Sequence, residues 1–130
     1  MSEHEFNWVD ARATCSPAKV FSSLFMGVKE DVRKMNELAP LSTRKRTFDA
    51  HSNESGKIFA VCPDGDTKSV VQFKLSDDHI EIEISKGAAP LIVTLTLDND
   101  GKCKLRVNGG ECLDQWQLRR DVLEELFFGR

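Results

Sequence analysis

The densest group of side chains able to do acid–base chemistry lies in residues 77–83, which read Asp-Asp-His-Ile-Glu-Ile-Glu. A histidine beside outward-pointing carboxylates can act as a general acid or base, and a hydrolase-like enzyme would need His79 to meet a carboxylate in a cleft. The same residues also fit an ordinary hairpin, with Asp77–Asp78 as the turn and with Glu81 and Glu83 paired to lysines on neighbouring strands. We favour the hairpin, because such clusters are commonly structural, and we predict no catalytic residue.

Motifs for metals, nucleophiles and cofactors are missing from the sequence. The histidines form no His-x-x-x-His pair and the cysteines form no Cys-x-x-Cys pair, which are the spacings that bring zinc ligands together. Neither a Gly-x-Ser-x-Gly turn nor a glycine-rich phosphate loop occurs, and Asp98–Gly101, which resembles part of a calcium loop, is better explained as a hairpin turn. We therefore expect no metal and no cofactor. The residues considered are His4, His51, His79, Cys15, Cys62, Cys103 and Cys112.

The cysteines and the N-terminus both bear on the compartment. The four cysteines are widely spaced, and we predict that they are reduced, buried thiols. Two disulfides are the alternative if the protein is exported. Residues 1–5 are polar and acidic and lack the basic and apolar stretches of a secretory signal. Together these features predict a cytoplasmic protein.

The charge balance bears on the class of partner. The chain carries 18 basic and 21 acidic residues, a net charge of −3, and the two signs are mixed along it. General binding to nucleic acid or to anionic membranes usually needs a strongly basic surface, so we expect neither partner. The short basic cluster Arg44–Arg46 is interpreted as a solvated strand end. No apolar run approaches the roughly 18 residues of a membrane span.

A helix is predicted from Ser16-Pro17 to Pro40, because serine caps a helix start and proline suits the first helical position. Its apolar residues recur at spacings of three and four, which is the pattern of an amphipathic helix. Gly27 predicts a bend or a break. The preceding segment, Phe6–Thr14, is predicted to be a short strand or a docked arm with its aromatic side chains buried.

From residue 44 the period changes to two, which predicts six strands at 44–51, 57–62, 68–76, 79–85, 91–98 and 102–108. The links are too short for crossover helices, so neighbouring strands should pair antiparallel. Alternate positions are apolar: Val71, Phe73, Leu75, Ile80, Ile82, Ile84, Leu91, Val93, Leu95, Leu97, Cys103, Leu105 and Val107. The other positions are polar and predict a wet face: Gln72, Lys74, Glu81, Glu83, Thr94, Thr96, Lys102, Lys104 and Arg106.

A second helix is predicted from a capping box formed by Asp114 and Gln117 to Gly129, with Trp116 on its apolar side. At 130 residues the chain suits one domain. The predicted fold class is therefore α+β: a six-stranded antiparallel meander whose apolar face is covered by an N-terminal and a C-terminal helix.

This order of elements is similar to the helix-grip layout of START-like proteins. Residues 16–21, Ser-Pro-Ala-Lys-Val-Phe, look like the start of that family's first helix. The resemblance implies a small apolar ligand enclosed between the sheet and the helices. Such a pocket would be lined by residues such as Phe25, Phe73 and Leu95.

The sequence leaves three functional hypotheses, in a definite order. The first is a non-enzymatic protein-binding or regulatory module, acting on a protein partner or as a homodimer. Its contact surface would be the wet sheet face, although the same charges also suit a simply solvated face. The second is the apolar-ligand pocket, and the third is the hydrolase-like enzyme. The predicted contact residues are Lys74, Glu81, Glu83, Lys102, Lys104 and Arg106.

Overall fold

The computed structural model describes residues 7–38, 47–65, 69–84 and 89–129. The predicted α+β class is confirmed. Three helices are present, α1 (Trp8–Thr14), α2 (Pro17–Leu38) and α3 (Gln115–Phe128). The strands are β1 (Phe48–Ser52), β2 (Ile58–Pro63), β3 (Val71–Leu75), β4 (Ile80–Glu83), β5 (Leu91–Leu97), β6 (Cys103–Val107) and β7 (Cys112–Leu113).

The strands form one antiparallel meander in the order β1-β2-β3-β4-β5-β6-β7. All six predicted strands have a counterpart, and the two-residue β7, which pairs with β6, was missed because it is too short to alternate. The basic cluster Arg44–Arg46, together with Phe6 and Pro40, lies outside the described residues. Within those residues, no helix combines the length and the apolar character that a membrane span requires.

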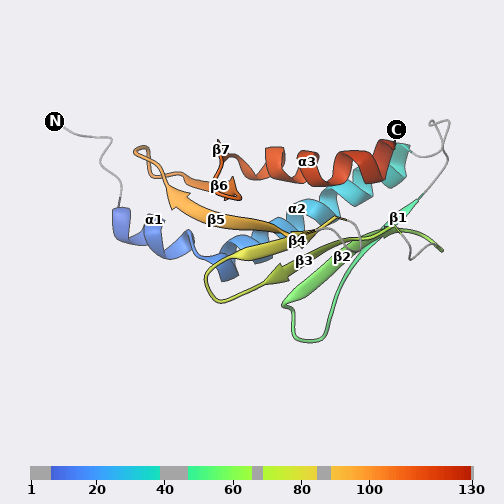
Figure 1. Ribbon diagram of the computed structural model, residues 1–130, viewed down its shortest axis with the longest axis horizontal. Coiled ribbons are helices and arrows are strands. Elements are labelled where there is room, and N and C mark those ends of the chain that lie inside the picture. Colours follow the sequence, from blue (N-terminus) through green and yellow to red (C-terminus); the bar gives the residue numbers. More distant parts are fainter. Residues whose placement is uncertain (1–6, 39–46, 66–68, 85–88, 130) are drawn as a thin grey trace.

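Helices α2 and α3 lie on the same side of the curved sheet, while α1 lies at the end of the molecule opposite the C-terminal end of α3 (Figure 1). The inner sheet face and the two helices share one hydrophobic core. This placement confirms the predicted alternation, because the apolar positions of the central strands face the helices. The fully buried residues of the core include Leu24, Val28, Phe59, Val61, Phe73, Ile80, Ile82, Val93 and Leu118.

Helix α2 runs without interruption across Gly27, so the predicted break into two helices is wrong. A Cβ atom at Gly27 would collide with the guanidinium group of Arg119 and with the side chain of Gln115, both from α3. The glycine therefore makes room for α3 side chains where the two helices cross. Glycine in a helix costs about 1 kcal/mol relative to alanine. At position 27 it also allows the close approach of α3 side chains to α2.

The segment predicted as a strand or docked arm is helix α1, so that prediction is wrong. The side chain of Asn7 accepts hydrogen bonds from the N–H groups of Val9 and Asp10, both at 3.1 Å, and caps the helix. The predicted burial of its aromatic residue is also wrong, because Trp8 is 66% exposed. The helix-grip order, which begins with a strand, is therefore not followed at this end of the chain.

A disulfide joins Cys15 to Cys103, so the prediction of four free thiols is wrong. The bond ties the junction of α1 and α2 to the start of β6. Spacing did not reveal it, because the two residues are separated by 88 positions in the sequence. Cys62 is buried and Cys112 is exposed.

Two polar contacts fix the ends of the helix layer. Asn36 of α2 donates a hydrogen bond from Nδ2 to the Phe48 carbonyl (3.0 Å) and accepts one at Oδ1 from the Phe48 N–H (2.8 Å). An amide side chain thus pairs with the edge strand β1 as a neighbouring strand would. At the other end of the sheet, the predicted capping box of Asp114 and Gln117 is confirmed at the start of α3.

Candidate functional site

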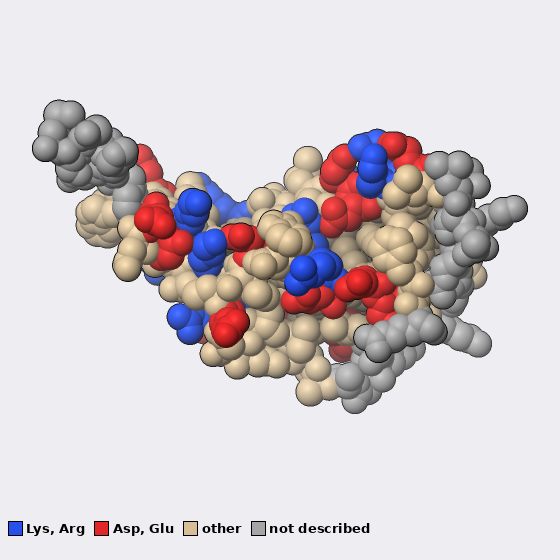
Figure 2. Space-filling model, turned by 90° about the horizontal axis from the view of Figure 1, so that it is seen from above, with Lys and Arg blue, Asp and Glu red and all other residues tan. Residues whose placement is uncertain are grey.

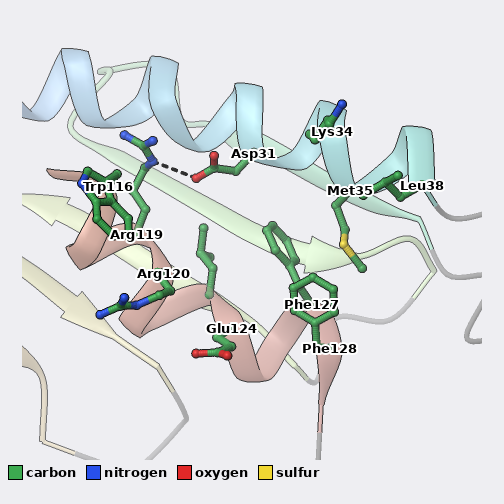
Figure 3. Close-up of a pocket in the computed structure, with 11 residues that line it drawn as sticks. Asp31, Lys34, Met35, Leu38, Trp116, Arg119, Arg120, Glu124, Phe127 and Phe128 are labelled. Atoms are coloured by element: carbon green, nitrogen blue, oxygen red, sulfur yellow. Dashed lines mark hydrogen bonds and ion pairs between the residues drawn. The ribbon is translucent and has the colours of Figure 1, made fainter. Parts of the chain in front are cut away.

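A groove of about 320 Å³ lies between the C-terminal half of α2 and the length of α3 (Figure 3). Buried Met35, Leu123 and Phe127 contribute to it, and its more exposed residues include Trp116 (53% exposed) and Phe128 (61%). Exposed apolar patches on a soluble domain commonly mark an interaction surface. We call this feature the α2–α3 groove. Its lining is Asp31, Lys34, Met35, Leu38, Trp116, Arg119, Arg120, Leu123, Glu124, Phe127 and Phe128.

The groove exists because α3 is apolar on more than one side. Leu118 and Val122 pack into the shared core with the sheet. Trp116 and Phe128 do not reach that core and are left beside α2. The sequence analysis assigned Trp116 to the apolar side of the helix that covers the sheet. The structure places it at the groove instead, because a single sheet face cannot cover an apolar surface that extends so far around a helix.

An ion pair fixes the separation of the two helices. Arg119 Nε donates to Asp31 Oδ2 at 2.7 Å, and Arg119 Nη1 donates to Gln115 Oε1 at 2.6 Å. Gln115 in turn donates to the Ser23 hydroxyl at 3.2 Å. Both charged side chains of the pair are partly buried. The groove is therefore held open by a polar network and is formed before any ligand arrives, as most binding sites are.

Charge at the groove is mixed but not fully paired. Arg120 lies over the Trp116 ring, 5.2 Å from its centroid, in a cation–π contact, and it also pairs with Asp121 at 3.1 Å. Within the described part of the chain, the carboxylate of Glu124 has no hydrogen bond or ion pair. Figure 2, seen from the side of α3, shows acidic and basic side chains interspersed over this face rather than gathered by sign. Glu124 is thus a negative charge available to a ligand.

The predicted contact residues lie mainly on the outer face, the side of the sheet away from the helices. Lys74 is directly opposite Glu81 in the β3–β4 pairing, and Glu83 is opposite Gln72. Such cross-strand pairs are worth about 0.2–1 kcal/mol each.

The remaining predicted contact residues lie on or beside β6. Lys104 is opposite Thr96 and Arg106 is opposite Thr94 in the β5–β6 pairing, while Lys102 precedes β6. Lys104 also forms an ion pair with Asp114, whose hydrogen bond raises the pKa of the lysine. Several outer-face charges are therefore already satisfied within the chain.

His79 lies between two carboxylates at the β3–β4 turn. Its Nδ1 is 2.6 Å from Asp78 Oδ1 and its Nε2 is 2.9 Å from Glu81 Oε2. Hydrogen bonding to Asp78, and then to Glu81, raises the pKa of His79 above its ordinary value. The same contacts lower the pKa of Asp78 and of Glu81. Both contacts therefore favour the protonated imidazolium over the neutral ring.

This arrangement gives His79 the carboxylate partners that the enzyme hypothesis required, but it also occupies both ring nitrogens. A general base needs a ring nitrogen that is free to accept a proton, and both nitrogens of His79 lie within hydrogen-bond distance of a carboxylate of its own chain. The nearby Ser76 hydroxyl donates to Glu81 at 3.2 Å and not to His79. The geometry is that of a charged contact that stabilises the β3–β4 hairpin. We call this contact between His79, Asp78 and Glu81 the His79 brace.

The three residues predicted for an apolar pocket all belong to the shared hydrophobic core, with Phe73 buried in it and Phe25 and Leu95 packed against it. Phe25 lies 4.6 Å and Phe73 lies 4.4 Å, ring centroid to centroid, from the ring of Phe59, so these two share an aromatic cluster. Phe73 is fully buried in it. Leu95 instead lines a surface hollow of about 500 Å³ near α1, beside Arg12, Asp77, Asp78 and the threonines of β5. The pocket therefore stays a prediction.

The described residues contain no group of three or more His, Cys, Asp or Glu side chains placed to hold a metal ion. Comparison with protein-family models, with curated proteins and with solved structures gave no match to this chain. The functional argument therefore rests on the geometry of the α2–α3 groove.

Proposed function

We propose that this chain is a non-enzymatic protein-binding module and that the α2–α3 groove receives an apolar segment of a polypeptide. The single observation behind the proposal is the placement of exposed Trp116 and Phe128 beside the buried floor of a preformed groove. Tryptophan and arginine are the residue types that most often dominate binding energy, and Trp116 here lies under Arg120. An amphipathic helix that lays its apolar face into a hydrophobic groove is a common mode of peptide recognition.

Glu124, which has no ion-pair partner among the described residues, adds a charge requirement to the proposal. A segment that buries apolar side chains against Met35 and Phe127 would bring its own polar groups to the edge of the groove. A lysine or arginine one helical turn from those apolar residues would pair with Glu124, whereas an acidic residue there would be repelled. The occupant is thus an apolar segment with a basic side chain.

Site-specific photo-cross-linking tests this proposal. A photoreactive phenylalanine analogue at Phe128 should form a covalent adduct with one polypeptide segment, which mass spectrometry identifies, and Glu124→Arg should suppress the adduct. The matched control places the same analogue at Lys74 on the outer sheet face. Adducts at position 74 with none at position 128 would move the binding surface to the sheet face and overturn the groove proposal.

A small apolar ligand is the second candidate for the groove. Its volume of about 320 Å³ falls at the lower end of the ~300–1,000 Å³ typical of small-molecule sites. Native mass spectrometry of the purified protein separates the candidates. A bound mass of a few hundred daltons, lost in a Phe128→Asp variant, would favour the small ligand over the polypeptide.

The compartment belongs to this proposal as well. A cytoplasmic location, which is the expectation from the sequence, would keep the thiols reduced. The Cys15–Cys103 disulfide instead suits an oxidising compartment. Alkylation of the protein in its native cells before lysis, followed by intact-mass measurement, distinguishes these cases, because a reduced pair adds two more alkyl groups than a disulfide.

A further inference from the structure

We propose that the polypeptide in the α2–α3 groove is helix α1 of a second copy of this chain. This inference rests on the proposed function and names the partner. Helix α1 has no buried residue, and it exposes Trp8 (66%) and Val9 (55%) to solvent. Two such side chains on a seven-residue helix leave a large apolar surface in water, and its burial against a partner would stabilise a complex.

The charge on α1 matches the charge of the groove. Arg12 is four residues after Trp8 and three after Val9, so the three side chains are neighbours on the helix surface. The guanidinium of Arg12 makes one long hydrogen bond, 3.5 Å to the Cys15 carbonyl, and no ion pair within the described residues, although Arg12 lines the same surface hollow as Asp77 and Asp78. Arg12 is therefore the basic side chain that Glu124 requires, one turn from an apolar pair.

The contact must form between two molecules. On α2 the groove begins at Asp31, 14 residues after the start of the helix, and a helix rises about 1.5 Å per residue, so roughly 20 Å separates this part of the groove from α1. The Cys15–Cys103 disulfide holds the end of α1 against β6 and prevents it from folding back. In Figure 1, α1 and the C-terminal end of α3 lie at opposite ends of the molecule.

Each copy offers one α1 and one groove, so two copies related by a two-fold axis can satisfy both contacts at once. The interface is modest. Trp8, Trp116 and Phe128 are already between a third and a half buried in one copy, which limits what the dimer can add. We therefore expect an area below the ~1,200–2,000 Å² of stable complexes and a dimer that dissociates on dilution through roughly the micromolar range.

Charge reversal tests the contact in a way that folding defects cannot imitate. In sedimentation velocity, Arg12→Glu and Glu124→Arg should each weaken the dimer by about tenfold or more, because each homodimer then holds two like-charged pairs. An equimolar mixture of the two variants should recover dimerisation, since the mixed dimer contains one reversed and one original ion pair. The matched control, Glu125→Arg, makes the same charge change on α3 outside the groove and should leave dimerisation unchanged.

Two results would overturn the inference: a monomer at every concentration up to roughly a millimolar, or a dimer whose dissociation constant stays that of the unmodified chain in both Arg12→Glu and Glu124→Arg. Neither result alone removes the proposed function. A monomeric chain whose position-128 cross-link joins a different polypeptide would keep the groove as a binding site and reject the second copy. A monomeric chain with cross-links only at position 74 would reject both.

Discussion

At the scale of single residues, the His79 brace shows how the chain uses its titratable groups. Sequence reasoning brought His79, Asp78 and Glu81 into one segment because they are adjacent in the chain. The sequence could not tell whether a ring nitrogen stays free, since that depends on the side-chain geometry of the β3–β4 turn. In the structure both nitrogens are occupied, which favours a structural role over acid–base chemistry.

We predict that the pKa of His79, measured by NMR titration of its ring protons, lies above 6.5. Asp78→Asn should lower this pKa more than Glu81→Gln, because the hydrogen bond to Asp78 is the larger cause of the shift. A His79 pKa at or below 6.5 would show that the two carboxylates do not hold the imidazolium.

The brace also predicts a pH window for stability. A raised histidine pKa contributes stability that is complete below pH 6.5 and is lost as the pH rises through the folded-state pKa of His79. The lowered pKa values of Asp78 and Glu81 contribute stability above their ordinary values of 3.8 and 4.5, and this is lost as the pH falls through the folded-state values. The contribution should be greatest between about pH 4.5 and 6.5, and His79→Gln should remove the loss on the alkaline side.

At the scale of elements, the helices and strands with a regular apolar period were predicted, and the features without such a period were not. The buried positions of α2 recur at helical spacing, and the strands alternate, so both followed from period alone. Segment 8–14 mixes apolar and polar residues without a clear period, and its helix depends on the Asn7 cap. The disulfide depends on two residues that only the tertiary fold brings together, so no spacing rule could find it.

Asn36 is predicted to stabilise the docking of α2 on the sheet edge. Asn36→Ala should lower the free energy of unfolding by about 1–3 kcal/mol, because the N–H and the carbonyl of Phe48 both lose a hydrogen-bond partner. Asn36→Asp, which keeps the acceptor and loses the donor, should have a free energy of unfolding between those of the unmodified chain and of Asn36→Ala. Urea denaturation measures the difference. Asn99→Ala, in an exposed turn, should be neutral, and equal stability of both alanine variants would contradict the prediction.

The disulfide is predicted to stabilise the fold through the long loop that it closes. The double variant Cys15→Ser/Cys103→Ser should lose about 2–4 kcal/mol of unfolding free energy, since the cross-link restricts the unfolded chain over 88 residues. Cys112→Ser, at an exposed thiol, is the control and should unfold as the unmodified chain does. If reducing agent leaves the urea midpoint of the unmodified chain unchanged, this account of the bond is wrong.

At the scale of the whole molecule, the fold was easier to predict than the candidate site. Amphipathic patterns identified two helices and one sheet, and this was enough to place both helices on the apolar face. The α2–α3 groove could not be predicted from these patterns, because Met35 and Phe127 meet only when the two helices pack against each other. One signal was present in the sequence: the last helix carries apolar residues at Trp116, Leu118, Val122 and Phe127–Phe128, which is more of its circumference than one sheet can cover.

The central claim is that the α2–α3 groove is occupied by a polypeptide, and hydroxyl-radical footprinting of the protein in extracts of the cells that make it tests this most directly. Relative to dilute purified protein, Trp116 and Phe128 should be protected from oxidation. Met26 is 63% exposed on α2 but outside the groove, so it should be oxidised equally in both samples. Equal oxidation of Trp116 and Phe128 in the two samples would contradict the claim.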